Sequence, residues 1–301
     1  MTKIQKELAG PGFHSEVRVP YSALARKVGS HKETVRLAVK RAERSQFIRE
    51  WRALLNPLLI GQKLGSLHVE ARLDGNEKTR AISQIRLIEG VAIIANYHGG
   101  SLRVAFYYES EESAERKIRL IASICDVKNE DTTFMKVDLP LRGTLKKTDW
   151  IVIKAISQNP RRKNVDIALE LGLSSRTVNR RIRKITESRA IFLIALIDVE
   201  DSVGLSVNYL VRCSDQAKGE IDNLLEVQRL VFATPTTNEY YTALLVFKNI
   251  SEAERFKEKL GKVPGVKEVR MYLLKEHIFV DSWLDGIIQR NAASSLASQV
   301  V

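Results

Sequence analysis

The sequence contains few residues of the kind that form disulfides or cysteine-based metal sites. Cys125 and Cys213 are the only cysteines among 301 residues, and their spacing is not that of a CxxC pair. This scarcity excludes a disulfide scaffold and a thiolate zinc site. We expect both thiols to be buried and reduced.

Long apolar runs are also missing. No run approaches the roughly 18 apolar residues of a membrane-spanning helix, and the opening MTKIQKELAG has no apolar core of a signal peptide. The sequence shows no paired carboxylates, no Ser/His/Asp set, no phosphate-binding glycine loop and no metal-ligand spacing. We therefore expect a soluble, cytoplasmic protein that is not an enzyme, with no cofactor, no metal and no membrane partner.

Positive charge is abundant and concentrated. The net charge is +12. The segment from Arg18 to Arg52 has ten Lys or Arg against three acids, and the segment from Arg161 to Arg189 has nine against three. The remaining chain is close to neutral, so two defined places favour a polyanionic partner.

The second of these segments has the pattern of a helix-turn-helix. Residues 163–194 predict a short helix with Val165, Ala168 and Leu171 inward, a turn at Gly172 and a second helix from Ser174 or Ser175. On that second helix Val178, Ile182 and Ile185 share one face, opposite a cationic face. A solvated basic helix is the alternative for this stretch alone.

The pattern occurs twice. Shifting the sequence by 143 residues places residues 22–48 on the motif without a gap, with Gly29 on Gly172 and Val35 on Val178. The chain is therefore interpreted as a tandem repeat. After each motif the period changes to that of strands, in the order β-α-β-β-α-β, which predicts a ferredoxin-like sandwich with one free sheet face.

These patterns predict an α+β fold with two winged helix-turn-helix domains alternating with two ferredoxin-like (RAM-type) domains. The expected boundaries are 1–60 and 61–138 for the first pair, 139–148 for a linker, 149–197 and 198–280 for the second pair, and 281–301 for a C-terminal helix and tail. A short first helix is expected at residues 2–9, and a short wing or strand within residues 47–60. The final helix is expected to end near Gln289.

The architecture resembles the Lrp/AsnC family of feast/famine transcriptional regulators. The resemblance is most specific at DIALELGLSSRTVNRRI (166–182) and at LLNPLLIG (54–61). It implies sheet domains that pair through their free faces, two DNA-binding units on one duplex, homo-oligomers and a small-molecule effector. The family frequently has Gly and an acidic residue near the turn between the second and third strands. The candidate effector residues are His98, Gly99, Gly100, Thr236 and Asn238, and the second copy lacks glycine there, which argues against an amino acid.

The expected partner is double-stranded DNA, and the expected contacts lie on and beside the two recognition helices. In the second copy they are Ser174, Ser175, Arg176, Thr177, Asn179, Arg180 and Arg183, with Arg161, Arg162 and Lys163 on the backbone. In the first copy they are His31, Lys32, Thr34, Arg36, Lys40 and Arg41. Ser30 and Glu33 predict a capping box that starts the first recognition helix one residue early.

Two other functions remain open from the sequence. Proteins that resemble siroheme decarboxylases combine the same domains, and a tetrapyrrole site would need His68, His98, Arg103 and Arg212 to converge. An architectural protein that binds DNA with low specificity is the other alternative, and the apolar final helix would serve its assembly.

Overall fold

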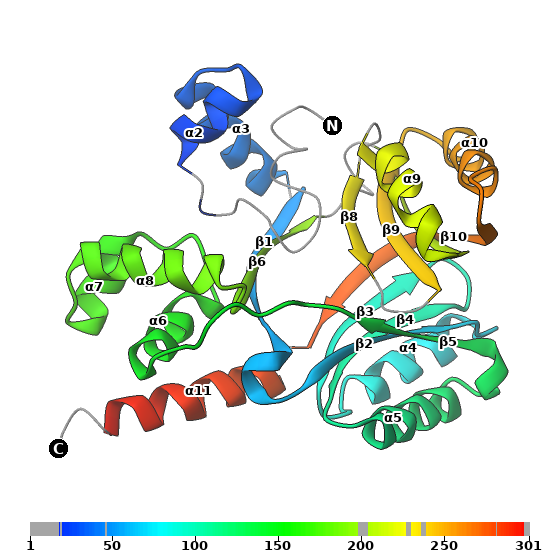
Figure 1. Cartoon of the computed structure of the whole chain (residues 1–301), viewed down its shortest axis with the longest axis horizontal. Helices are drawn as coiled ribbons and strands as arrows, with labels where there is room; N and C mark the ends of the chain where they lie inside the picture. Colours follow the sequence, from blue (N-terminus) through cyan, green and yellow to red (C-terminus); the bar gives the residue numbers. More distant parts are fainter. Residues whose placement is uncertain are drawn as a thin grey trace.

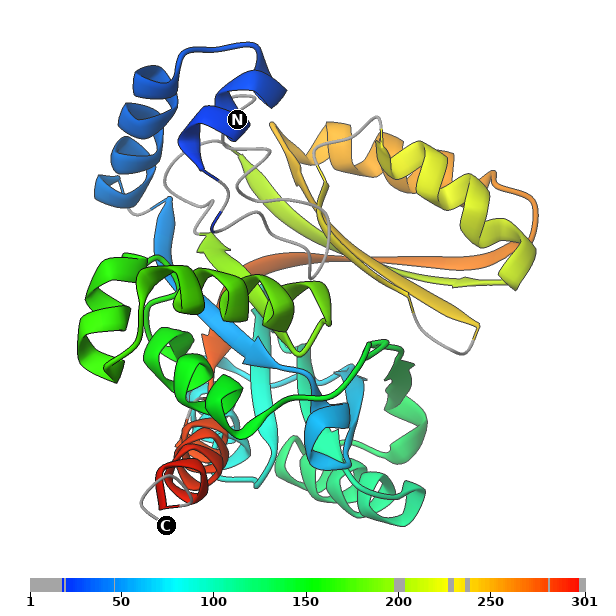
Figure 2. The ribbon, with the colours of Figure 1, turned by 60° about the vertical axis from the view of Figure 1, so that its left-hand side comes forward.

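The computed structural model describes residue 18 and residues 20–45, 47–197, 204–226, 230–235, 239–280 and 282–297. Figures 1 and 2 show the two helix-turn-helix units and the last helix on one side, and two α/β sandwiches on the other. In each half a helix-turn-helix is followed by a strand and then by a β-α-β-β-α-β sandwich. The predicted α+β fold is therefore confirmed, whereas the expected helix at residues 2–9 lies outside the described residues.

The first helix-turn-helix consists of α2 (Tyr21–Val28) and α3 (Lys32–Arg44). Val35 and Val39 lie on the inner face of α3 and are fully buried. The predicted capping box is wrong, because His31 is the N-cap and Glu33 instead receives two hydrogen bonds from Arg36 at 2.8 and 2.9 Å. The Glu33 carboxylate gains more from a charge-assisted hydrogen bond with the Arg36 guanidinium than from capping a backbone amide that water can hydrate. The helix α3 therefore does not start one residue early.

The second unit consists of α6 (Lys147–Ser157), α7 (Asn164–Leu171) and α8 (Ser175–Glu187). Ser174 caps α8 by accepting a hydrogen bond from the Thr177 amide at 3.1 Å. The predicted buried face of α8 is confirmed, since its three aliphatic residues are at most 5% exposed. The inward position of Val165 is wrong: Val165 is 64% exposed, and Ile167 packs into the core in its place.

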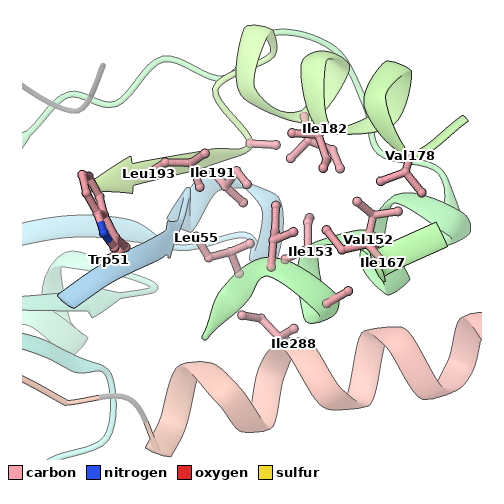
Figure 3. Packing of buried hydrophobic residues seen from close by; sticks show 14 of the residues in the cluster. Trp51, Leu55, Val152, Ile153, Ile167, Val178, Ile182, Ile191, Leu193 and Ile288 are labelled. Carbon is pink, nitrogen blue, oxygen red and sulfur yellow. The ribbon is translucent and has the colours of Figure 1, made fainter. Parts of the chain in front are cut away.

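A strand follows each recognition helix, and these two strands pair with each other. β1 (Ile48–Leu55) runs antiparallel to β6 (Ile191–Ile197), with Leu55 opposite Ile191. The predicted short wing or strand within residues 47–60 is therefore a strand, and it forms one two-stranded sheet with its counterpart in the second half. Figure 3 shows how Trp51 and Leu55 of β1 and Ile191 of β6 join the residues beneath α8 and α6 in one core.

Both sandwiches have the predicted order of elements. The first contains β2 (Lys63–Val69), α4 (Gly75–Ile85), β3 (Val91–Tyr97), β4 (Leu102–Tyr108), α5 (Glu111–Ile124) and β5 (Thr132–Val137). The second contains β7 (Leu205–Cys213), α9 (Asp215–Glu226), β8 (Leu230–Pro235), β9 (Tyr240–Phe247), α10 (Ile250–Gly261) and β10 (Val266–Phe279). Short 3-10 turns, Pro57–Ile60 and Asn129–Asp131, precede β2 and β5.

The two sandwiches form one body through β10. The first part of β10 pairs with β7 and its last part with β3, which gives one eight-stranded sheet in the order β5-β2-β4-β3-β10-β7-β9-β8. The faces without helices also pack together. Arg103 of β4 donates to the Thr242 hydroxyl of β9 at 3.1 Å, and Tyr97, Leu244 and Leu274 form a shared apolar cluster. The expected pairing of free faces thus occurs within one chain.

The last helix, α11 (Ser282–Ala297), is longer than predicted and reaches past Asn291. Leu284 and Ile288 are buried in the core that also contains α6, and the indole of Trp283 lies 5.3 Å from the ring of Tyr107. The expectation that this apolar face serves assembly is therefore wrong, because the chain itself covers it. Within the described part of the chain, helices lack the length and apolar character needed to cross a membrane.

Gly100 has a packing role in the turn between β3 and β4. A Cβ at this position would lie 2.1 Å from the Ala71 carbonyl oxygen and 2.7 Å from the Leu73 amide nitrogen. We expect Gly100→Ala to lower the free energy of unfolding by about 1–3 kcal/mol, because rigid backbone must move. Gly75→Ala is the matched control, because a Cβ there meets nothing within 4 Å. Urea unfolding checks this, and equal stability of the two variants would contradict it.

Candidate nucleic-acid interface

The side of α8 that faces away from the core carries long hydrogen-bond donors. Exposed residues at the start and along this side are Ser174, Ser175, Arg176, Asn179, Arg180 and Arg183, and Thr177 is half-buried. Of these, Arg183 pairs with Glu187 at 3.2 Å and Asn179 accepts from Asn164 at 3.2 Å. The remaining surface of α8 therefore combines a donor-rich face with an apolar underside fixed in the core.

The equivalent side of α3 has a different character. His31, Lys32, Thr34, Lys40 and Arg41 are exposed, whereas Arg36 is half-buried beside Glu33. Leu37 is 50% exposed at the position that corresponds to Arg180. The two outward faces thus differ in charge and in polarity at matching positions.

Of the three cations expected to hold the DNA backbone, two form contacts within the protein and one is exposed. The Arg161 guanidinium lies 5.1 Å from the ring of Tyr21 and 4.8 Å from that of Trp51, both of the first unit. Arg162 donates to the Ala155 carbonyl at 3.1 Å and pairs with Glu170. Lys163 is exposed before α7. Arg161 and Arg162 are therefore engaged within the protein, and Arg161 joins the two units through cation–π contacts.

A buried carboxylate supports α8 from below. Asp149 is fully buried and receives hydrogen bonds from Arg181 at 2.7 Å, Lys184 at 3.1 Å and the Lys146 amide at 2.7 Å. Burial alone would raise the pKa of Asp149. The Lys146 amide and the two cations outweigh burial, so the net pKa of Asp149 lies below its ordinary value.

Comparisons with known proteins agree with this geometry. Residues 145–188 match the family model described as winged helix-turn-helix DNA-binding. A stretch of 142 residues is 28% identical to the HTH-type transcriptional regulator FL11 of Pyrococcus horikoshii, covering 46% of this chain and 94% of that protein. The chain is therefore similar to HTH-type transcriptional regulators, and its residues 145–188 match a winged helix-turn-helix family. Half of its length thus corresponds to nearly a whole regulator of that kind.

Solved structures show how far the fold of the chain is shared. The structural match with the siroheme decarboxylase NirDL covers 97% of this chain and 96% of the NirDL chain, with a TM-score of 0.57 and 14% sequence identity. AsnC of E. coli covers 44% of this chain at 18% identity, with a TM-score of 0.35. The likeness to NirDL extends over both halves and concerns the fold.

Only three of the five predicted effector residues lie in the described part of the chain. His98 and Gly99 are exposed in the turn after β3, where Gly99 has φ +80°, and Gly100 approaches residues 71–73. Thr236 and Asn238 lie outside the described residues. Backbone conformation explains glycine at position 99, and close packing explains it at position 100. The two glycines are therefore not evidence of an effector.

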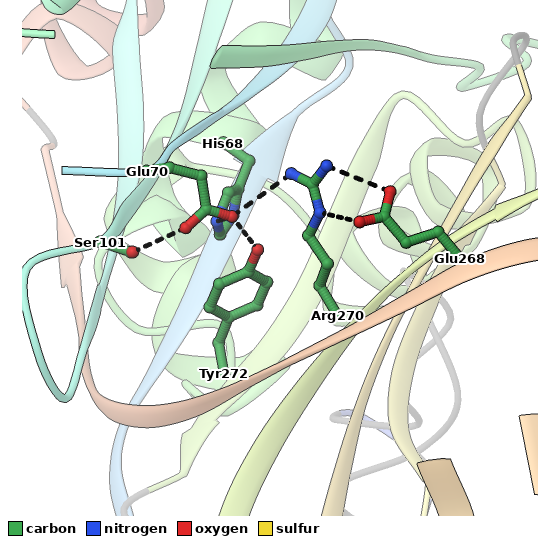
Figure 4. A network of polar contacts seen from close by, with 6 residues as sticks. All are labelled: His68, Glu70, Ser101, Glu268, Arg270 and Tyr272. Atoms are coloured by element: carbon green, nitrogen blue, oxygen red, sulfur yellow. Dashed lines mark hydrogen bonds and ion pairs between the residues drawn. The ribbon is translucent and has the colours of Figure 1, made fainter. Parts of the chain in front are cut away.

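A polar network between the sandwiches was missed by the sequence analysis. Glu70 accepts from the Ser101 hydroxyl at 3.1 Å and from the Tyr272 hydroxyl, and Arg270 lies 3.4 Å away while bound to Glu268 at 2.7 Å (Figure 4). Burial opposes ionisation of Glu70, yet the hydrogen-bond donors around it lower its pKa to about 2. The only sequence signal was the alternation of β2, which places polar side chains on the free face.

The four residues expected for a tetrapyrrole site do not converge either. His68 and Arg103 are buried between the sheets, whereas His98 and Arg212 are exposed and Arg212 pairs with Glu239 at 2.8 Å. The ring of His68 lies 4.1 Å from that of Tyr272 and 5.6 Å from that of Tyr97. These stacked rings fill the space beside His68.

The support of α8 by Asp149 can be tested through pH. We expect Asp149→Asn to lower the free energy of unfolding by about 2 kcal/mol at pH 7, because charge-assisted hydrogen bonds are lost. Since the folded pKa of Asp149 is depressed, its contribution is complete above the unfolded value of about 3.9 and disappears as pH falls through the folded value.

The measurement is urea unfolding of the wild type and the variant at pH 7 and at pH 3. The difference between them should shrink at pH 3. The control is Asp166→Asn on exposed α7, which we expect to change stability by less than about 0.5 kcal/mol. A difference for Asp149→Asn that stays constant with pH would show that the charge of Asp149 has no role.

Proposed function

We propose that this chain is a sequence-specific regulator of transcription that acts in the cytoplasm by binding double-stranded DNA. One observation carries the proposal: α8 has a fixed apolar underside and an outward face with exposed Arg176, Asn179 and Arg180. Arg donates bidentately to guanine and Asn to adenine in the major groove. The match of residues 145–188 to a DNA-binding family and the similarity to FL11 support it.

The structure supports a regulator with two unlike reading helices. α3 presents Lys32, Thr34 and Leu37 where α8 presents Ser175, Thr177 and Arg180. An apolar side chain such as Leu37 suits a thymine methyl group, whereas an Arg suits guanine. Because β1 and β6 pair within the chain, a single chain holds both helices. Further homo-oligomers and a small-molecule effector stay predictions from the family resemblance.

The experiment that tests the function is selection of preferred sites from random duplexes, followed by measurement of affinity for the selected and for unrelated duplexes at one salt concentration. A gene-specific regulator is expected to bind its site at least roughly 10³ times more tightly. A ratio near one would identify the architectural alternative. No binding of either duplex would overturn the function.

The shape of the preferred site is a separate prediction. Identical halves favour palindromes, but α3 and α8 differ, so we expect an asymmetric site with two unlike half-sites about one helical turn (~34 Å) apart. Each half-site would be duplicated in inverted orientation, and binding of the two palindromes compared with that of the natural order. Tighter binding of either palindrome than of the asymmetric site would refute this prediction.

The two helices should also contribute differently to affinity. We expect Arg180→Ala to weaken specific binding more than Leu37→Ala, by about 1–3 kcal/mol if Arg180 pairs with guanine, and to reduce the salt slope by about one unit if it contacts a phosphate. Leu37→Ala should leave the salt slope unchanged, since it removes no charge. Titration of labelled duplex at several salt concentrations measures both quantities. Equal losses in the two variants would count against the assignment of Arg180.

An enzymatic function like that in the name of NirDL is the other candidate, and the shared fold is its support. The separation of His98 and Arg212 from the buried pair His68 and Arg103 does not favour it. Visible absorbance after incubation with siroheme is the direct test. A new band that His68→Ala and Arg103→Ala each abolish would favour the enzyme.

A further inference from the structure

The linker between the two halves lies along the second half of α8 and forms a groove with it. The groove has a volume of about 640 Å³. Its walls are Arg142 and Lys146 of the linker and Arg180, Arg181, Arg183, Lys184, Glu187 and Ser188 of α8 and its end. Six of these eight residues are cations and one is an acid, so the groove has a strong preference for anions.

The linker is fixed in this position by the backbone. The Arg142 amide donates to the Ser188 carbonyl at 2.8 Å, and Lys184 donates to the Thr144 carbonyl at 3.1 Å. Leu141 and Leu145 pack against the apolar core, which leaves Arg142 and Lys146 exposed on the outer side. A wall that is already ordered costs little entropy when a ligand binds.

The charges of the groove are only partly neutralised inside the protein. Asp149 forms ion pairs with Arg181 and Lys184 beneath α8, and Glu187 forms an ion pair with Arg183. Within the part of the chain that the structure describes, Arg142, Lys146 and Arg180 form no ion pair, and all three are exposed along the groove. These three cations line an open groove of about 640 Å³, which suits an extended polyanion better than a single small anion.

We infer that this groove binds the sugar-phosphate backbone of the duplex, with Arg142 and Lys146 as phosphate contacts beside the recognition helix. The inference rests on the proposed function, because α8 brings the duplex to this place. A linker that contacts phosphates would add affinity without sequence information, since phosphates are the same at every step. It would also hold the backbone strand that flanks the major groove read by α8.

The test compares wild type, Arg142→Ala/Lys146→Ala and the double variant Lys128→Ala/Lys262→Ala, whose two cations are exposed on the sandwiches. We expect the groove variant to lose roughly tenfold or more in affinity for every duplex at ~0.1 M salt, with a salt slope smaller by about two units and an unchanged order of sequence preference. The control variant should keep the affinity and slope of the wild type.

The outcomes separate the inference from the function. Duplex binding that the groove variant leaves unchanged would overturn the inference and leave the function standing, as would a loss of sequence preference in place of a uniform loss. Absence of duplex binding by the wild type would overturn both. Competition with inorganic pyrophosphate distinguishes the source of the phosphate: displacement of the duplex at micromolar pyrophosphate would assign the groove to a free anion and overturn the inference.

Discussion

The pairing of β1 with β6 is the constraint on which the arrangement of this protein depends. Each strand leaves a recognition helix and leads toward a sandwich, so pairing the strands fixes both helix-turn-helix units in one body. Asn56 is buried where the strands meet the linker. Its side-chain amide donates to the Arg189 carbonyl at 2.9 Å, and its backbone amide donates to the Ala190 carbonyl at 2.9 Å. These bonds satisfy backbone groups that would otherwise be buried without partners.

The two sandwiches are likewise held together by strand pairing between the halves. β10 completes two sheets at once, and the free faces bury Arg103 against Asn208 and Thr242. In a homodimer the two faces would be identical and every change would occur twice. Within one chain the faces can differ: one contributes His68, Tyr97 and Arg103, and the other contributes Asn208, Thr242 and the apolar Leu244. The fused arrangement therefore permits two unlike halves in both layers of the molecule.

Much of the fold could be predicted because periodicity is a local signal. Val178, Ile182 and Ile185 lie on one face at helical spacing, and strands such as β4 alternate between the helix side and the free side. Val165 was wrongly placed because a short helix with apolar residues all round has no unique inward face. The capping box failed because Arg36, one turn along α3, competes for Glu33.

Contacts between the halves could not be predicted, because no pattern within either repeat contains them. The β1–β6 pairing joins residues that are ~140 positions apart, and Arg161 lies on aromatic rings of the other unit. In the sequence, Arg161 is one more cation before a DNA-binding helix, and Asp149 one acid in a basic stretch. Only the fold separates cations that support the protein from cations that remain available to a partner.

That separation changes how the basic segments are understood. In the second segment Arg161 and Arg162 form contacts within the protein, and Arg181 and Lys184 share an ion pair with Asp149. Arg176 and Arg180 remain on the outer face. The number of cations thus overstates the charge that a duplex can meet. Their position matters more, because a few exposed donors on a helix held rigidly from below need little reorganisation to bind. A buried carboxylate beneath the recognition helix serves this rigidity, although it reduces the net positive charge.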